Sequence, residues 1–153
     1  MKRIALIATA CVLACSPAAA QETAVDFSYS PVSPGAWNYR EIAGGSEADF
    51  VDGTGATRMV VSCGKVTRLV TLSRVSTAPA ANLSFWTSSA SRSLGARFDQ
   101  PSGRVISQVG GADPLLDAIA LSRGRFATMM PGSPALVLPA APEIAHVVED
   151  CRS

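Results

Sequence analysis

The amino-acid sequence predicts a mainly β protein: an antiparallel β-sandwich with one short helix and a C-terminal helix packed on the sheet. Between residues 36 and 109, short segments rich in Val, Thr, Phe, Trp and Leu are separated by Gly, Ser, Asn and Pro, which is typical of antiparallel strands joined by turns. Met59, Val61 and Cys63 share one parity, so a strand through them presents one apolar face. The 153 residues are 48% hydrophobic with a formal net charge of +1, which favours a folded core over disorder.

The length predicts one domain, over residues 36–153, behind a secretory leader and an arm. Residues 1–20 have the three parts of a signal peptide: a basic start, an apolar run over 4–15 and small residues that end at Ala20. The apolar run is shorter than the roughly 20 residues of a membrane-spanning helix, so no transmembrane segment is expected. We therefore expect cleavage after Ala20 and a periplasmic or secreted protein.

Cys15 offers an alternative, because Val12-Leu13-Ala14-Cys15 resembles a bacterial lipobox. Acylation of Cys15 would make the chain an outer-membrane lipoprotein. Without residues 1–20, 11 basic and 12 acidic residues remain. A near-neutral chain lacks the clustered cations that bind nucleic acid or anionic lipid, so neither partner is expected.

Residues 21–35 contain two prolines and several serines between scattered aromatic residues, and we expect a flexible, exposed arm that packs loosely through Phe27 and Tyr29. From Ala36 the turn residues divide the chain into seven expected strands. They are residues 37–41, 48–51, 58–63, 65–74, 83–88, 93–98 and 104–109. Residues 62–65 (Ser-Cys-Gly-Lys) are expected to form a tight hairpin turn, and Val66, Val70 and Leu72 to share a face.

A helix is expected over 115–121, ending near Gly124, because Asp113 is a good N-cap and Pro114 suits the first helical position. Two further strands, 125–130 and 135–138, flank a Pro-Gly-Ser-Pro turn. A final helix runs from Ala141 or Pro142 to Cys151. Its apolar positions fall at helical spacing and put the last cysteine on the buried face. They are Ile144, Val147, Val148 and Cys151.

Two cysteines, Cys63 and Cys151, remain after the leader. An even count in an exported chain predicts one disulfide, here closing a loop of about 88 residues and stabilising the fold by roughly 4 to 5 kcal/mol on the chain-entropy model. A metal or redox site is the alternative, but two thiols and one histidine without metal-ligand spacing are too few soft ligands. No metal and no cofactor are expected.

No catalytic constellation is predicted. His146 is the single histidine and no G-x-S-x-G elbow accompanies it, so we interpret it as a surface helix residue. Ser62 and Lys65 match S-x-x-K by spacing alone, since the segment is expected to be a hairpin rather than a helix. Asp113 and Asp117 are explained as an N-cap and a first-turn acid rather than as the paired carboxylates of a glycosidase.

Arg123 and Arg125 are the densest basic pair and form a candidate anion-binding site, because the planar guanidinium suits carboxylate, sulfate or phosphate groups. The alternative is that they only solubilise the chain and cap a helix end. Trp37 and Trp86 are the largest apolar groups. A buried tryptophan would anchor the core, whereas an exposed one would mark a contact site.

The layout resembles the invasion-associated locus B family of exported alphaproteobacterial proteins, or an exported sister group of it. The shared pattern is the leader, Trp37, Cys63 in a mid-chain strand, the Asp113-Pro-Leu-Leu-Asp117-Ala helix, a glycine-turn hairpin and a closing helix. The resemblance implies a periplasmic or envelope β-sandwich with no catalytic residues to carry over. We expect an exported, non-enzymatic domain that binds a protein partner. The alternatives are a small-ligand or anion carrier and a small hydrolase that uses His146 with a serine.

Overall fold

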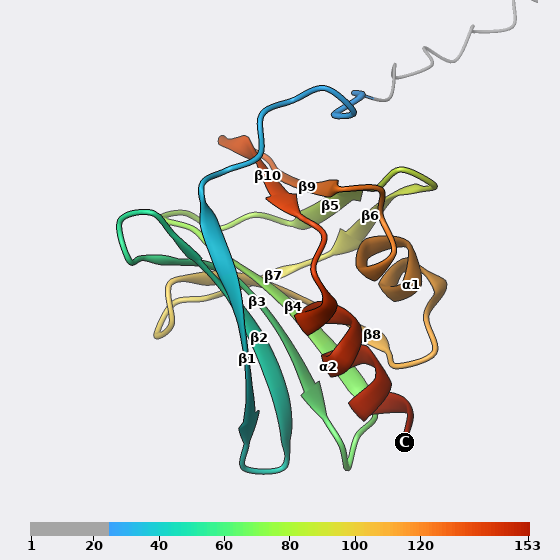
Figure 1. Cartoon of the computed structure of the whole chain (residues 1–153). Coiled ribbons are helices and arrows are strands. Elements are labelled where there is room, and N and C mark those ends of the chain that lie inside the picture. The colour runs from blue at the N-terminus through green and yellow to red at the C-terminus, as the bar shows by residue number, and fades with distance from the viewer. Residues whose placement is uncertain (1–24) are drawn as a thin grey trace, which may run out of the picture.

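The computed structural model describes residues 25–153, which form ten strands and two helices. A six-stranded antiparallel sheet has the order β1-β2-β3-β4-β8-β7, and a four-stranded antiparallel sheet has the order β10-β9-β5-β6. The strands of the second sheet run across one end of the long strands β1 to β4 (Figure 1). The prediction of a mainly β fold with two helices is confirmed. The strands are β1 (Gly35–Ile42), β2 (Gly45–Asp52), β3 (Thr57–Gly64), β4 (Leu69–Val75), β5 (Asn82–Trp86), β6 (Ser91–Gly95), β7 (Arg97–Asp99), β8 (Arg104–Gly110), β9 (Arg125–Met130) and β10 (Ser133–Pro139).

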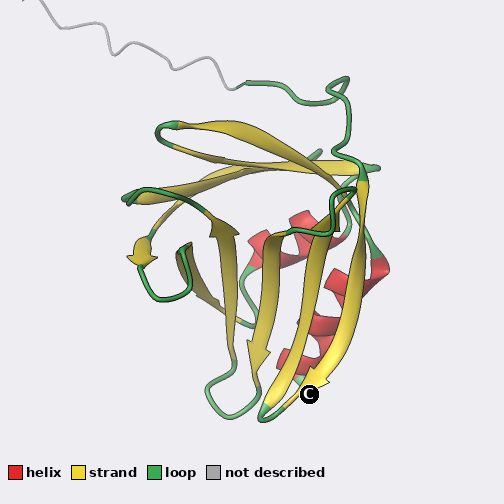
Figure 2. Cartoon of the chain, turned by 90° about the vertical axis from the view of Figure 1, so that its left-hand side faces the viewer, coloured by secondary structure: helices red, strands yellow, loops and turns green. Residues whose placement is uncertain are grey.

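The long strands of the six-stranded sheet divide cleanly into an inner and an outer face. Met59, Val61 and Cys63 of β3 are buried toward the core, as their shared parity predicts. Figure 2 looks onto the opposite face, with both helices behind the sheet. Strands β1 to β4 therefore bury one face against the rest of the domain and leave the other uncovered by any described element.

The hairpin between β3 and β4 differs from the prediction. Ser62 and Cys63 pair with Thr71 and Val70 inside the sheet, so the expected turn over 62–65 is wrong. The turn lies after Gly64, and Arg68 closes it with a φ of 53°. Val66 lies in this turn and is 93% exposed, so it does not share the buried face of Val70 and Leu72. The alternation of buried side chains continues through Cys63, and this extends β3 by one residue.

The single strand expected over 93–98 is two strands in two sheets. β6 ends at Gly95 in the four-stranded sheet, and β7 begins at Arg97 in the six-stranded sheet. At the crossing point the Ala96 amide donates to the Ala81 carbonyl at 2.8 Å, and the Ser107 hydroxyl donates to the Gly95 carbonyl at 3.1 Å. The composition of this segment predicts extended chain but not the change of sheet.

Helix α1 (Pro114–Ala120) begins as predicted, with the Asp113 carboxylate accepting a hydrogen bond from the Leu115 amide at 2.9 Å. It ends one residue before the predicted limit. Helix α2 (Pro142–Arg152) buries its predicted apolar face against β1, β2 and β3. The described residues contain no helix long and apolar enough to cross a membrane.

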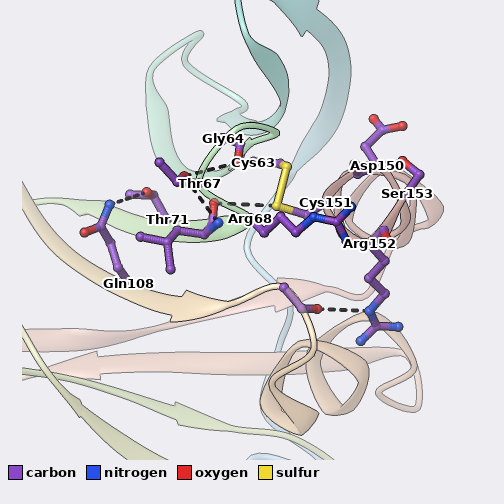
Figure 3. The surroundings of a disulfide bond; sticks show 12 residues. Cys63, Gly64, Thr67, Arg68, Thr71, Gln108, Asp150, Cys151, Arg152 and Ser153 are labelled. Atoms are coloured by element: carbon purple, nitrogen blue, oxygen red, sulfur yellow. Dashed lines mark hydrogen bonds between the residues drawn. A yellow bond between two sulfur atoms is a disulfide. The ribbon is translucent and has the colours of Figure 1, made fainter.

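The predicted disulfide joins Cys63 of β3 to Cys151 of α2 (Figure 3). The two Cα atoms are 5.4 Å apart, within the range that a disulfide spans, and both side chains are buried. On the same side of α2, the Arg68 side chain donates to the Arg152 carbonyl, and the Arg152 side chain donates to the Gly111 carbonyl. The last helix is thus tied to the sheet at its C-terminal end.

The described part of the arm covers the outer face of the four-stranded sheet. Phe27 is buried and meets Trp86 edge to face, with ring centroids 5.8 Å apart, among Ala127 and Val137. Tyr29 is 96% exposed, so the expected packing holds for Phe27 and is wrong for Tyr29. Residues 1–24, with the expected signal peptide and Cys15, lie outside the described residues.

Candidate ligand-binding site

His146 lies on the exposed side of α2 and packs flat on Tyr39 of β1, with ring centroids 4.0 Å apart. The Tyr39 hydroxyl donates to the Asp150 carboxylate at 2.7 Å, and this hydrogen bond raises the pKa of Tyr39. Within residues 25–153 no serine hydroxyl is hydrogen-bonded to His146. Ser62 lies in β3 and Lys65 in the following turn. Lys65 is therefore not placed one helical turn from Ser62, as the S-x-x-K motif of serine enzymes requires.

The two aspartates considered as a carboxylate pair have separate partners. Asp113 caps α1 and accepts two hydrogen bonds from Arg92, at 2.7 and 2.9 Å. Asp117 forms an ion pair with Arg152 at 2.9 Å. Asp113 caps α1 and Asp117 lies in its first turn, as the sequence predicts. The ion pairs with Arg92 and Arg152 are further contacts that the sequence did not predict.

Arg123 and Arg125 have different surroundings in the structure. The Arg125 side chain donates to the Ser30 carbonyl and so fastens the arm to β9, whereas Arg123 is exposed. One of the two guanidinium groups is therefore already engaged by the chain. Anion binding by this pair stays a prediction.

Another arginine, Arg74, is buried inside the fold. Arg74 on β4 points inward, is 7% exposed, and reaches across to the other sheet. It donates to the Thr128 carbonyl at 2.8 Å, to the Thr128 hydroxyl at 3.4 Å and to the Pro134 carbonyl. Within the described part of the chain, no carboxylate forms an ion pair with it. Arg74 is thus a buried cation held by neutral acceptors alone.

Arg74 lines a cavity of about 440 Å³ between the arm, the turn that follows β2, and β10. The volume lies in the range of small-molecule sites. Pro34, Val75 and Leu136 form apolar walls, and the lining also includes Ser33 and Thr54. The cavity thus combines an apolar body with one buried positive charge.

The other two charged residues that line this cavity, Asp52 and Arg58, form an ion pair with each other. The Asp52 carboxylate accepts hydrogen bonds from Thr54, at 2.6 Å from the hydroxyl, from the Ala56 amide at 3.0 Å and from the Arg58 side chain at 2.5 Å. The Thr54 hydroxyl and then Arg58 hold the pKa of Asp52 well below its usual range. Asp52 and Arg58 neutralise one another, so the charge of Arg74 remains the uncompensated one.

Burial lowers the pKa of Arg74 to about 10, and at neutral pH the group is still a cation. Its side chain can therefore donate to an anion, and a guanidinium pairs well with the planar carboxylate. The described residues contain no group of three or more His, Cys, Asp or Glu side chains that could hold a metal ion. The arrangement is suited to binding an anionic group.

Sequence reasoning missed Arg74, although a signal for it exists. Arg74 has the parity of Val70 and Leu72, which places a charge on the inner face of a strand. Its acceptors lie on β9 and β10, far along the chain, and no local pattern indicates them. The chain matches no protein-family model, no curated protein and no solved structure.

Proposed function

We propose that the protein is an exported, non-enzymatic binding domain that holds a small carboxylate ligand with an apolar body in the Arg74 cavity. The observation that carries this proposal is the buried Arg74 guanidinium, which lines a cavity of about 440 Å³ without a carboxylate partner. It replaces Arg123 and Arg125 as the anion-binding group of the carrier hypothesis.

A buried charge without an opposite charge is costly, and such groups are normally paired. Three acceptors from β9 and β10 orient Arg74 and leave further guanidinium N–H groups for a ligand. A carboxylate in the cavity would supply the missing negative charge. The apolar walls would add affinity in proportion to the apolar surface that the ligand buries.

The test compares octanoate, octanol and octylammonium by calorimetry on the protein exported by its own leader. Octanoate should bind more tightly than octanol by about tenfold or more, since a hydrogen bond between two charged groups is stronger than a neutral one. Arg74→Gln should remove this difference. Leu136→Trp should weaken both ligands by filling the cavity without touching the guanidinium. Equal binding of the three probes, or no binding, would contradict the proposal.

Arg123→Gln is the matched control, because Arg123 is exposed and does not line the Arg74 cavity. Arg125 is left unchanged, since it holds the arm whose Ser33 and Pro34 line the cavity. The Arg123→Gln variant should bind octanoate as the unaltered protein does. If Arg123→Gln rather than Arg74→Gln loses octanoate binding, the anion site is the one expected from the sequence.

Export rests on the leader-like residues 1–20 and on the Cys63–Cys151 bond, since disulfides persist in oxidising compartments. Mass spectrometry of protein from the host envelope tests it. A chain that begins at Gln21 supports a periplasmic or secreted domain, and an acylated chain that begins at Cys15 supports a lipoprotein. A chain that retains Met1 would contradict export.

A protein partner is the second candidate, favoured by an apolar tip where two hairpins meet. The Lys65 amide donates to the Gly44 carbonyl at 3.0 Å and joins the turns. Beside them Ile42, Val66 and Leu69 are exposed. Lys65 is the single lysine of residues 21–153, so an amine cross-linker applied to cells can attach a partner at its ε-amine or at the α-amine of the chain's N-terminus. The adduct at Lys65 should be lost in Lys65→Arg and weakened in Val66→Ser. An adduct whose yield neither variant lowers would exclude the tip.

A further inference from the structure

Figure 2 shows the outer face of the six-stranded sheet, with both helices behind it. The residues that line this face form a polar cleft. Here a cavity of about 280 Å³ is lined by charged and hydroxyl side chains from five strands. They include Arg40, Glu47, Asp49, Ser62, Ser73 and Arg104. This cleft is separate from the Arg74 cavity, with which it shares no lining residue.

Asp49 of β2 points to this outer face and is only 7% exposed. Its Oδ1 atom is buried and accepts no hydrogen bond from the described residues. The nearest cation is Arg40, whose Nη1 lies 3.7 Å from that oxygen and whose other nitrogen pairs with Glu47. Buried carboxylate oxygens normally accept a hydrogen bond, so Asp49 lacks a donor.

Arg104 of β8 shows the converse deficiency. Its Nη1 atom is buried and has no acceptor among the described residues. Asp99 is its cross-strand neighbour on β7, but the Asp99 carboxylate pairs with Arg97 at 3.8 Å and accepts from Ser102 instead. Arg104 therefore lacks an acceptor.

Asp49 and Arg104 cannot satisfy each other directly. Asp49 pairs with Val60, Val60 pairs with Ser73, and Ser73 pairs with Ile106 of β8, two residues from Arg104. The backbones of Asp49 and Arg104 are therefore three strand spacings apart, about 14 Å across the sheet, and about 7 Å apart along the strand direction. The cavity of about 280 Å³ also exceeds the roughly 30 Å³ that one water molecule occupies. A ligand that bridges the two groups must donate at one end and accept at the other.

We propose that this cleft binds a small free α-amino acid, with its ammonium group on Asp49 and its carboxylate on Arg104. The lining contains two arginines, one glutamate and one aspartate, so its formal charges balance and a neutral zwitterion adds no net charge. Ser73 lies on the strand between the two ends and offers a hydroxyl group, and Ser62 lines the cleft beside Glu47. Both ends of the zwitterion would form charge-assisted hydrogen bonds, which are stronger than neutral ones.

The experiment titrates glycine and L-serine into the full exported protein by calorimetry, with acetate, methylammonium and acetamide as probes that each lack part of the zwitterion. Glycine or L-serine should bind, and the three incomplete probes should not. Asp49→Asn and Arg104→Gln should each lower the affinity about tenfold or more, because each removes one charge-assisted hydrogen bond. Arg123→Gln, which removes an exposed arginine outside the cleft lining, should leave the affinity unchanged.

Three results would overturn the proposal. They are the absence of binding by both amino acids, equal binding by acetamide, and an affinity that neither Asp49→Asn nor Arg104→Gln alters. Circular dichroism of each variant establishes that the sheet is intact, so a lost affinity is not lost folding. Arg74→Gln should keep amino-acid binding, which separates this site from the carboxylate cavity between the sheets.

Discussion

The ring of Tyr39 on β1 lies almost parallel to the imidazole of His146 on α2, with planes 10° apart and centroids separated by 4.0 Å. The Tyr39 hydroxyl continues this contact by donating to Asp150, one helical turn after His146. At the end of the same helix, Cys151 is bonded to Cys63 of β3. The one histidine of the chain therefore helps to dock the last helix on the sheet.

His146→Ala should lower the free energy of unfolding by about 0.5–1.5 kcal/mol, because stacked aromatic rings contribute this much beyond their buried area. His146→Phe keeps the ring and should lose less. Urea unfolding followed by circular dichroism measures both. Equal losses for the two variants would show that the stack contributes nothing.

The same variant tests the hydrolase alternative. His146→Ala would abolish an esterase or amidase activity that depends on the imidazole as a base. If the protein shows such an activity and His146→Ala retains it, His146 is not its base. Loss of the activity in a variant that remains folded would support the hydrolase.

Reduction of the Cys63–Cys151 bond should lower the free energy of unfolding by about 4 to 5 kcal/mol, since the bond closes a long loop in the unfolded chain. Thermal unfolding with and without a reductant measures the change. The double variant Cys63→Ala, Cys151→Ala is the control, and its melting temperature should not respond to the reductant. An unaltered protein that melts at the same temperature in both conditions would contradict a stabilising bond.

Apart from the disulfide, which the cysteine count indicated, the features that the sequence predicted correctly depend on neighbouring residues. Alternation indicated the buried side of β3, the Asp113 cap indicated the start of α1, and helical spacing placed Cys151 on the buried face of α2. Each of these rests on a period or a cap that a few adjacent residues define.

The features that the sequence did not predict depend on distant partners. The chain changes sheets at Ala96, where the contacts come from Ala81 and Ser107 rather than from adjacent residues. The acceptors of Arg74 come from strands β9 and β10. A binding site that combines residues from distant strands can be recognised only from the tertiary arrangement of the two sheets.

Phe27→Ala should loosen the first part of the arm from the four-stranded sheet, because the Phe27 ring packs on Trp86. Trp86 should then become more exposed to water. In a Trp37→Phe background, where Trp86 is the single tryptophan, the emission maximum should shift to longer wavelength. Tyr29→Ala is the matched control and should cause no shift, since Tyr29 is 96% exposed. A shift of equal size in both variants would contradict the packing through Phe27.

Asp52 should make stability fall at acidic pH. The Thr54 hydroxyl, then Arg58 and the Ala56 amide, lower the pKa of Asp52 in the folded state, whereas in the unfolded chain it is about 3.9. As the pH falls to about 4, the Asp52 carboxylate takes up a proton in the unfolded state before it does so in the folded state. The stabilisation is therefore present above pH about 4 and is lost as the pH falls further.

Urea unfolding between pH 6 and pH 2 measures this slope. Asp52→Asn keeps a hydrogen-bond acceptor but cannot titrate, so the free energy of unfolding of the variant should fall less steeply below pH about 4 than that of the unaltered protein. Thr54→Val removes the first cause of the lowered pKa and should reduce the slope in the same direction. Asp26 and Asp150 also have lowered pKa values, and they titrate equally in all these chains. If Asp52→Asn and the unaltered protein lose stability in parallel, the hydrogen bonds of this turn do not couple the protonation of Asp52 to folding.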